Sequence, residues 1–294
     1  MDLFDLPLPI LFGQLMLGLL NGSFYAMLSL GLAVIFGLLN IVNFAHGAQY
    51  MLGAFLTWML LTYLGIGFWG ALIIVPIVAG LTGMVIERVL IAPLADADHL
   101  YGLLLTFGIA LVIQGGFQVA YGAAGIPYRI PEALAGGQRF GAIFLPNYRL
   151  FVLVVSLTVC IGLWLAIEKT NLGAYLRAAT ENPELVSVFG INVPLLVSVT
   201  YGLGAALAGF AGVLAAPIYS VNPTMGVELL IIVFAVVVVG GMGSIAGAVV
   251  TALVLGLIEA LTKIVYPEAA SIVIFVIMII VLMVRPTGIF GRTA

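Results

Sequence analysis

Residues Glu168–Gly190 read EKTNLGAYLRAATENPELVSVFG and form a charged island between long apolar runs. The chain has nine Lys and Arg and twelve Asp and Glu residues, and five of these lie in the island. No charged residue occurs from Leu150 to Ile167 or from Leu185 to Val227. Apolar runs of this length are typical of membrane segments, so the island is expected to lie outside a membrane.

The island itself carries the signals of two short helices. Apolar or small residues recur at helical spacing in its first half: Leu172, Tyr175, Leu176 and Ala179. Asn182–Glu184 then supplies a helix cap, a first-turn proline and an acid near the positive helix end, and Gly190 is a stop signal. We expect a compact helical knob. Residue spacing alone supports two interpretations equally: this knob, or a solvated loop with amphipathic surface helices.

Composition predicts a membrane protein throughout. Hydrophobic residues make up 64% of the chain, charged residues 7%, and the mean hydropathy is +1.31. A soluble domain needs more charge to cover its surface. From Leu6 to Ile86 there is no Asp, Glu, Lys or Arg, and at roughly 20 residues per crossing this run holds about three spans. Residues 1–294 therefore read as one transmembrane domain.

The expected fold is an all-α polytopic membrane protein with eight or nine transmembrane helices. The segment 226–240 is short for a full crossing and precedes Gly240–Ser244, so a broken or re-entrant element is expected there. The apolar segments lie near residues 10–38, 43–64, 68–87, 100–121, 148–167, 192–216, 226–240, 245–264 and 270–285.

Several classes of function are disfavoured by the sequence. A net charge of −3 without a basic cluster argues against nucleic acid. The lysines, Lys169 and Lys263, do not lie in a phosphate-binding loop, so ATP hydrolysis would belong to another chain. Cys160 has no cysteine partner, and neither a metal site nor a catalytic group can be assembled. We therefore expect no cofactor and no enzymatic activity.

Polar and small residues interrupt the apolar segments at two places. Polar groups at membrane depth usually face a bundle interior or a cavity, which makes Asn43 and His46 candidates for a translocation pathway. Gly47 is interpreted as a helix break beside them. When the sequence is compared with itself at a shift of 194 residues, Gly47 aligns with Gly241. If the two segments are equivalent, Gly241, Gly243 and Ser244 also belong to the pathway. The alternatives are a hydrogen-bonded interhelix role for His46 and tight packing for the glycines.

Other polar residues are expected to be structural. Glu87–Arg88 is interpreted as an interfacial pair, with Arg88 reaching the headgroups. Glu259 is four residues before Lys263 and is expected to pair with it. Small residues at every fourth position predict close helix packing: Gly18 with Gly22, and Gly204 with Ala208 and Gly212.

Five stretches together resemble a known family. They are GAYLRAATENPELVSVFGINV at 173–193, NFAHGAQYMLGA at 43–54, LAGFAGVL at 207–214, GGMGSIAG at 240–247 and RPTGIF at 285–290. In this order they resemble the branched-chain amino acid permease family of ABC importers, and its LivH-type subunit most. The resemblance covers nearly the whole chain.

The resemblance implies a permease subunit of an ATP-driven importer for branched-chain or other neutral amino acids. It identifies the island, about 168–190, as a cytoplasmic loop that couples to ABC ATPase subunits. The expected partners are those ATPases, a second related permease subunit or another copy, an external substrate-binding protein and membrane lipid. The residues assigned to ATPase coupling are Gly173, Arg177, Ala178, Glu181, Asn182, Glu184 and Gly190.

Two alternatives stay open. A urea or short-amide permease of the same family would carry similar motifs. An ion-coupled secondary transporter would need charged residues deep in its spans, and only Glu228 and Glu259 are candidates.

The expected location is the cytoplasmic (inner) membrane of a bacterium or archaeon. If the island lies inside, five Lys and Arg residues are inside and four are outside. A difference of one residue does not decide the orientation. Counting spans places the N-terminus outside and the C-terminus inside. The loop at about 122–147 would then be external, with little regular structure, as a plain connector or a docking surface for the binding protein.

Overall fold

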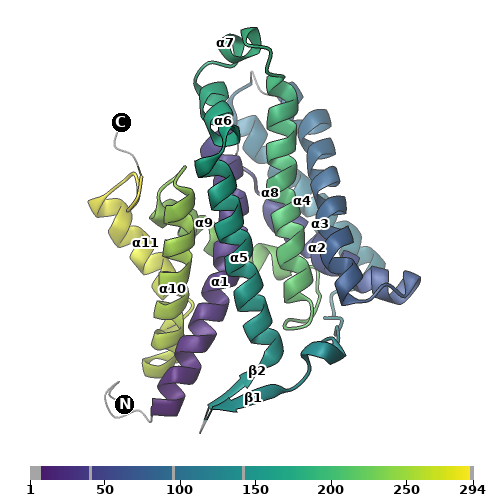
Figure 1. The fold of residues 1–294 in the computed structure, drawn as a ribbon, viewed down its shortest axis with the longest axis vertical. Coiled ribbons are helices and arrows are strands. Elements are labelled where there is room, and N and C mark those ends of the chain that lie inside the picture. The colour runs from purple at the N-terminus through teal and green to yellow at the C-terminus, as the bar shows by residue number, and fades with distance from the viewer. Residues whose placement is uncertain (1–7, 40–41, 95–96, 141–142, 292–294) are drawn as a thin grey trace. The chain divides into compact units, whose positions relative to one another are not determined.

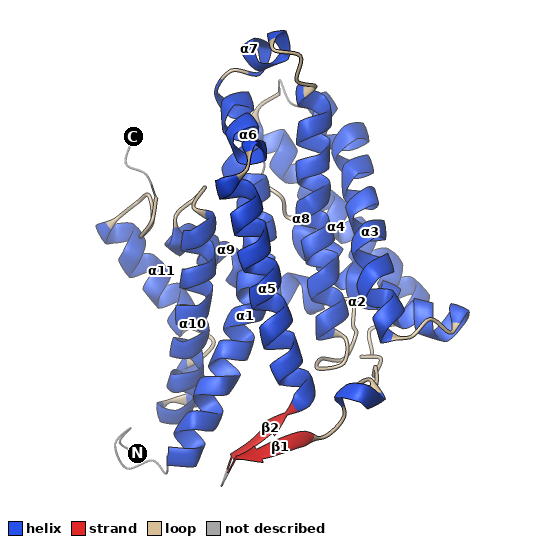
Figure 2. Ribbon diagram, in the orientation of Figure 1, coloured by secondary structure: helices blue, strands red, loops and turns tan. Residues whose placement is uncertain are grey.

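The computed structural model describes residues 8–39, 42–94, 97–140 and 143–291, and it is predominantly helical there (Figures 1 and 2). Each apolar segment expected from the sequence coincides with a helix. These are α1 (Leu8–Leu39), α2 (Ala45–Leu64), α3 (Phe68–Ile86), α4 (His99–Tyr121), α5 (Asn147–Lys169), α8 (Val193–Ala215), α9 (Met225–Gly240), α10 (Ile245–Val265) and α11 (Val273–Val284).

Length and apolar composition decide which helices can cross a membrane. Within the described residues, six spans are long and apolar enough: Pro9–Gly37, Phe68–Leu94, Leu100–Tyr121, Asn147–Lys169, Val193–Ala215 and Ile245–Val265. The apolar helices α9 and α11 have 16 and 12 residues. At about 1.5 Å per residue both are shorter than a hydrocarbon core of about 30 Å. The chain is thus a helical protein with several membrane-spanning helices.

The loop after α4 has more regular structure than the sequence predicted. Strands β1 (Gly137–Phe140) and β2 (Ile143–Pro146) pair antiparallel, and Gly137 lies opposite Pro146. A 3₁₀ turn, η4 (Glu132–Leu134), precedes them. The expectation of little regular structure was wrong here: Pro131 lies before the hairpin and Pro146 at its last pair, so neither proline interrupts the hydrogen bonds between the strands. The other short elements are η2 (Glu87–Ile91), η3 (Ala92–Leu94) and η5 (Pro267–Ala269).

The chain divides into two compact units, which are described separately. Unit 1 comprises Met1–Leu30, Ile130–Ile161 and Ile232–Ala294, and unit 2 comprises Gly31–Arg129 and Gly162–Ile231. Helices α1, α5 and α9 each contribute residues to both units.

Glycines allow the helices of unit 2 to pack backbone against backbone. A Cβ added to Gly53 of α2 would collide with the Gly209 carbonyl oxygen of α8, and one added to Gly212 with the Tyr50 carbonyl oxygen. A Cβ on Gly204 would lie 2.6 Å from the end of the Ile35 side chain and 2.9 Å from a backbone oxygen of α1. Close packing along the small-residue face of α8 is therefore confirmed.

In unit 1, α1 packs in the same way on α10. A Cβ on Gly18 or on Gly22 would come within 2.9 Å of the backbone of α10, which confirms the packing expected for this pair. The predicted ion pair is also present, with Glu259 Oε1 3.1 Å from Lys263 Nζ. Tyr25 of α1 donates a hydrogen bond to Glu259 Oε2 at 2.8 Å. The buried carboxylate thus has two partners and links α1 to α10.

The expectation for Glu87 was wrong. Its side chain is buried, and Ser198 of α8 donates a hydrogen bond to it, whereas Arg88 is exposed. The cause is tertiary packing: α8 lies against this end of α3 and supplies Ser198 as a partner, while the chain continues beyond Glu87 as the π-helix η2. A π-helical turn cannot be read from residue spacing.

Candidate functional site

The charged island forms two short helices with the predicted ends. Helix α6 is Asn171–Glu181 and α7 is Pro183–Val188. The Asn182 side chain accepts a hydrogen bond from the Leu185 backbone N–H at 2.9 Å and caps α7. Gly190 has a φ of +82°, a left-handed conformation that favours glycine. Asn182 therefore marks the start of α7, and Gly190 marks the end of the helical segment.

Gly173 holds α6 against the end of α5. It is buried, and a Cβ added there would collide with the Ile167 carbonyl oxygen. Any other residue at this position would force the two helices apart. Gly173 therefore determines the angle at which α6 leaves the membrane helix.

The other residues assigned to coupling are exposed on α6 and α7. Arg177 lies 3.8 Å from Glu168, and both side chains are roughly half exposed, at 44% and 47%. Such a pair adds about 0–1 kcal/mol to stability because water screens it. Its main effect is to orient the charges at the base of α6. The remaining exposed positions are Ala178, Glu181, Asn182, Glu184 and Gly190.

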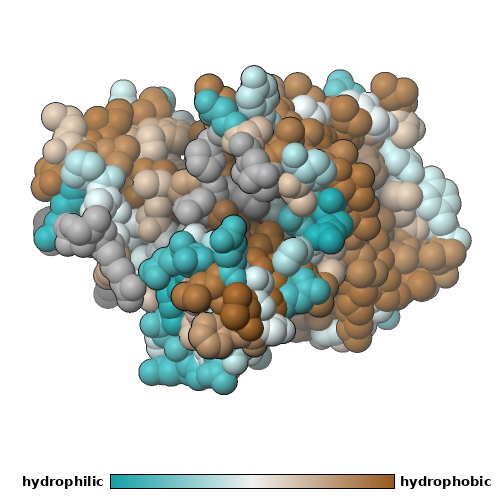
Figure 3. Space-filling model, turned by 90° about the horizontal axis from the view of Figure 1, so that it is seen from above, coloured by the Kyte–Doolittle hydropathy of each residue, from teal (hydrophilic) through white to brown (hydrophobic). Residues whose placement is uncertain are grey.

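Helix α7 also presents an exposed apolar patch that the sequence analysis missed. We call Leu185, Val188 and Phe189 the α7 patch; their exposed fractions are 55%, 81% and 77%. Figure 3 is viewed from the side on which α7 lies in Figure 1, and hydrophobic residues lie beside hydrophilic ones on that face. Large exposed apolar groups among acids are typical of a protein-binding surface. The signal was the sequence LVSVF, which is more apolar than a solvated helix requires.

A buried polar face lies at the start of α2 in unit 2. Asn43 lies just before the helix, and His46 and Gln49 lie on one side of its first turns; the three side chains are at most 1% exposed. Among the described residues, the Asn43 and Gln49 amides have no hydrogen-bond partner. The Tyr201 hydroxyl of α8 lies near Gln49, but no hydrogen bond of ordinary geometry joins them. A buried amide without a partner costs about 1–3 kcal/mol, so these two side chains lower the stability of the packing seen here.

Gly47 does not break the helix, contrary to the sequence interpretation. Helix α2 begins at Ala45, so Gly47 lies within its first turn. A Cβ on Gly47 would collide with the Gly226 carbonyl oxygen of α9. The interruption lies just before the helix, where Thr106 of α4 accepts a hydrogen bond from the Phe44 backbone N–H at 3.2 Å.

Gln49 and Tyr201 are the polar residues that the sequence analysis overlooked in this region. Gln49 continues the three-residue spacing of Asn43 and His46, and that spacing was readable from the sequence. Tyr201 carried no such signal, because its position beside α2 follows from the packing of α8. His46 itself lies against Gly31, where an added Cβ would be 2.9 Å from the imidazole Cε1.

The second predicted pathway segment is a tight turn in unit 1. Gly241 and Gly243 have φ values of +100° and +90°, and Ser244 caps α10 by accepting a hydrogen bond from the Gly247 N–H at 3.1 Å. The C-terminal segment packs on this turn, where the Phe290 N–H donates to the Gly240 carbonyl at 3.2 Å. Two of the five recognised sequence stretches thus contact each other. These contacts favour the packing role for Gly241.

The fold and these sites define the chain as a helical membrane protein with two short helices, α6 and α7, between the apolar helices α5 and α8. A family model described as branched-chain amino acid transport system / permease component matches residues 14–282. The chain belongs to this family, whose members are transport components and not enzymes.

Curated relatives match over nearly the full length. The chain is 33% identical to a high-affinity branched-chain amino acid transport system permease protein, BraD, from Pseudomonas aeruginosa, over 95% of each chain. It is 32% identical to the corresponding LivH protein of Salmonella typhimurium, over 95% of each chain. It is 27% identical to LivM of Escherichia coli, covering 92% of this chain and 68% of that protein. No solved structure matches the chain.

Proposed function

We propose that the chain is the transmembrane permease subunit of an ATP-driven importer in a bacterial or archaeal inner membrane. Its substrates are branched-chain or other neutral amino acids delivered by an external binding protein. Family membership and full-length similarity to BraD and LivH support this function. The urea and short-amide alternative has no support of this kind.

The observation that carries the proposal is the surface formed by α6 and α7. It combines capped helices, an exposed ion pair and the exposed α7 patch within a short polar connection between two apolar helices. We assign to it the docking of an ABC ATPase subunit, which couples hydrolysis to movement of the membrane helices. The similarity to both LivH and LivM supports a second, related permease subunit, with a second copy of this chain as the alternative.

The translocation pathway is assigned to the polar face of α2, with Asn43 and His46 as lining residues beside Gly47. In the present packing this face is buried and closed, as expected for one of the states of an alternating-access cycle. Gly241, Gly243 and Ser244 are the second pathway segment under the same proposal. Their contacts with the C-terminal segment favour the alternative, a packing role.

For topology we propose eight or nine transmembrane helices. The orientation with the N-terminus outside and the C-terminus inside corresponds to nine crossings, since an even number would place both termini on one side. The agreement of each expected segment with a helix supports this count. The β1–β2 hairpin and the residues before it are then external, as a connector or a docking surface for the binding protein.

The function is tested by purifying the permease with its candidate ATPase and measuring hydrolysis in the presence of binding protein and leucine. We expect leucine to stimulate hydrolysis. Val188→Asp in the α7 patch should weaken ATPase association at least tenfold, because removing an interface hot spot costs about 2 kcal/mol or more.

Ile130→Asp is the matched control, since it places the same charge on another exposed apolar residue, 43% exposed, outside the α7 patch. Equal ATPase binding by wild type and Val188→Asp would exclude docking through this patch. Absence of leucine stimulation in a fully assembled complex would contradict the importer assignment.

A further inference from the structure

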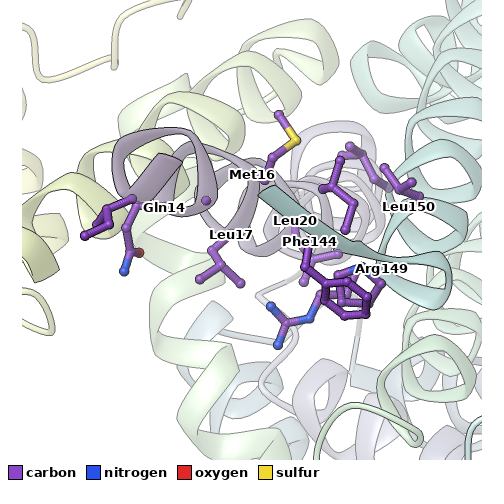
Figure 4. Close-up of a pocket in the computed structure, with 12 residues that line it drawn as sticks. Gln14, Met16, Leu17, Leu20, Phe144, Arg149 and Leu150 are labelled. Atoms are coloured by element: carbon purple, nitrogen blue, oxygen red, sulfur yellow. The ribbon is translucent and has the colours of Figure 1, made fainter. Parts of the chain in front are cut away.

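A groove in unit 1 lies between the first part of α1, strand β2 and the first part of α5. Its volume is about 410 Å³. Figure 4 shows Leu17 and Leu20 of α1 on one side and Phe144, Arg149 and Leu150 of β2 and α5 on the other. Its lining is otherwise almost entirely apolar, and its charged side chain is Arg149.

Arg149 lies in this groove without a protein partner. It is partly buried, and in the described ranges 8–39, 42–94, 97–140 and 143–291 it makes no ion pair and no side-chain hydrogen bond. A guanidinium that has lost part of its water shell is stabilised by an anion, and its planar donors fit a phosphate well. The first turn of α5, where Arg149 lies, adds the positive end of a 23-residue helix.

The rest of the groove requires an apolar ligand. Most of the lining belongs to the apolar spans Pro9–Gly37 and Asn147–Lys169, with β2 beside them, so we expect the groove to meet the hydrocarbon region of a membrane near one surface. A soluble phosphate would satisfy Arg149 but leave the partly exposed Leu17 and Leu150 uncovered. A lipid with a phosphate headgroup satisfies both parts, as in other basic pockets between membrane helices.

We propose that this groove is a specific site for one anionic phospholipid. Its phosphate binds the Arg149 guanidinium, and one acyl chain lies along Leu17, Leu20 and Leu150. The volume of the groove is sufficient for the headgroup end and the upper part of a chain, with the remainder in the bilayer. This site is independent of the transport activity proposed above.

The test is native mass spectrometry of the purified full-length permease, titrated with phosphatidylglycerol or phosphatidylcholine. We expect wild type to bind phosphatidylglycerol in preference. Arg149→Gln should weaken that binding about tenfold, because one charge-assisted contact is lost. Arg139→Gln is the matched control: Arg139 is exposed on the neighbouring strand β1 and does not line the groove. It should bind like wild type.

Three further results would contradict the proposal. Equal affinity of wild type and Arg149→Gln for phosphatidylglycerol would exclude the phosphate contact. Full displacement of the lipid by inorganic phosphate alone would exclude the acyl-chain contact and leave a simple phosphate site. Leu17→Trp, which fills the groove, should reduce lipid binding; if it only disrupts assembly with another permease subunit, the groove is a subunit contact.

Discussion

At the scale of single residues, Gly173 links the membrane part to the knob. Because its missing side chain lets α6 touch the Ile167 carbonyl, Gly173→Ala should shift α6 and destabilise the local packing by about 1–3 kcal/mol. We expect a lower Tm of the purified permease and weaker ATPase coupling. Gly162→Ala in α5 is the control, since a Cβ there meets nothing within 4 Å. A Tm equal to that of Gly162→Ala would refute the steric account.

The charge at Arg177 gives a second prediction at this scale. Arg177→Glu places two acids together at the base of α6, and because the pair is exposed it should change stability by less than about 1 kcal/mol. Leucine uptake by reconstituted vesicles should nevertheless decrease, since the charge presented to the ATPase is reversed.

The double variant Glu168→Lys/Arg177→Glu separates two explanations. It restores the ion pair with the charges exchanged. Recovery of uptake would show that only the internal pair matters, whereas continued loss supports a direct contact with the ATPase. Normal uptake by the single variant would remove Arg177 from the docking surface.

Several residue roles were predictable from sequence because they depend on neighbours along the chain. Asn182 as a cap, Gly190 as a stop and the Glu259–Lys263 pair all involve residues at most four positions apart. Glu87 was mispredicted because its partner, Ser198, is 111 residues away and meets it only through tertiary packing. Interactions between residues that are close in sequence can be predicted from the sequence, whereas pairs of residues that are distant in sequence cannot.

At the scale of elements, the start of α2 carries two buried side-chain amides, those of Asn43 and Gln49, without a hydrogen-bond partner among the described residues. In a Cys160→Ala background, cysteines at Asn43, His46 and Gln49 should react with a water-soluble thiol reagent only when transport opens this face. Reactivity should therefore change on addition of ATP, ATPase and substrate.

Met51→Cys is the control for this scan. Met51 is on the opposite side of α2 and is 1% exposed, so it should stay unreactive in each state. Protection of the three test positions in each transport state would exclude them from the pathway and leave a packing role.

The helices were predictable from apolar runs and their ends, but the relation between elements was not. The 194-residue offset equated Gly47 with Gly241, yet one lies inside a helix and the other in a left-handed turn. The hairpin after α4 and the packing of the C-terminal segment on Gly240 depend on contacts between distant residues. Residue patterns carry no direct signal for such contacts.

At the scale of the whole molecule, orientation in the membrane can be measured directly. In the Cys160→Ala background, Gln138→Cys in β1 should react with an impermeant thiol reagent in intact cells, because the hairpin is expected outside. Glu181→Cys in α6 should react only after the membrane is made permeable. Both positions are exposed in the structure, so burial does not explain a difference. The reverse pattern would invert the proposed topology.

The central claim is that this chain moves a neutral amino acid across a membrane at the expense of ATP hydrolysed by another subunit. The most direct test is uptake of labelled leucine, urea and a neutral sugar by vesicles that contain the permease, its ATPase and the binding protein. The account predicts ATP-dependent uptake of leucine, and loss of that uptake with Val188→Asp. Uptake of urea without leucine would contradict the substrate, and leucine uptake without ATP or the ATPase would contradict the mechanism.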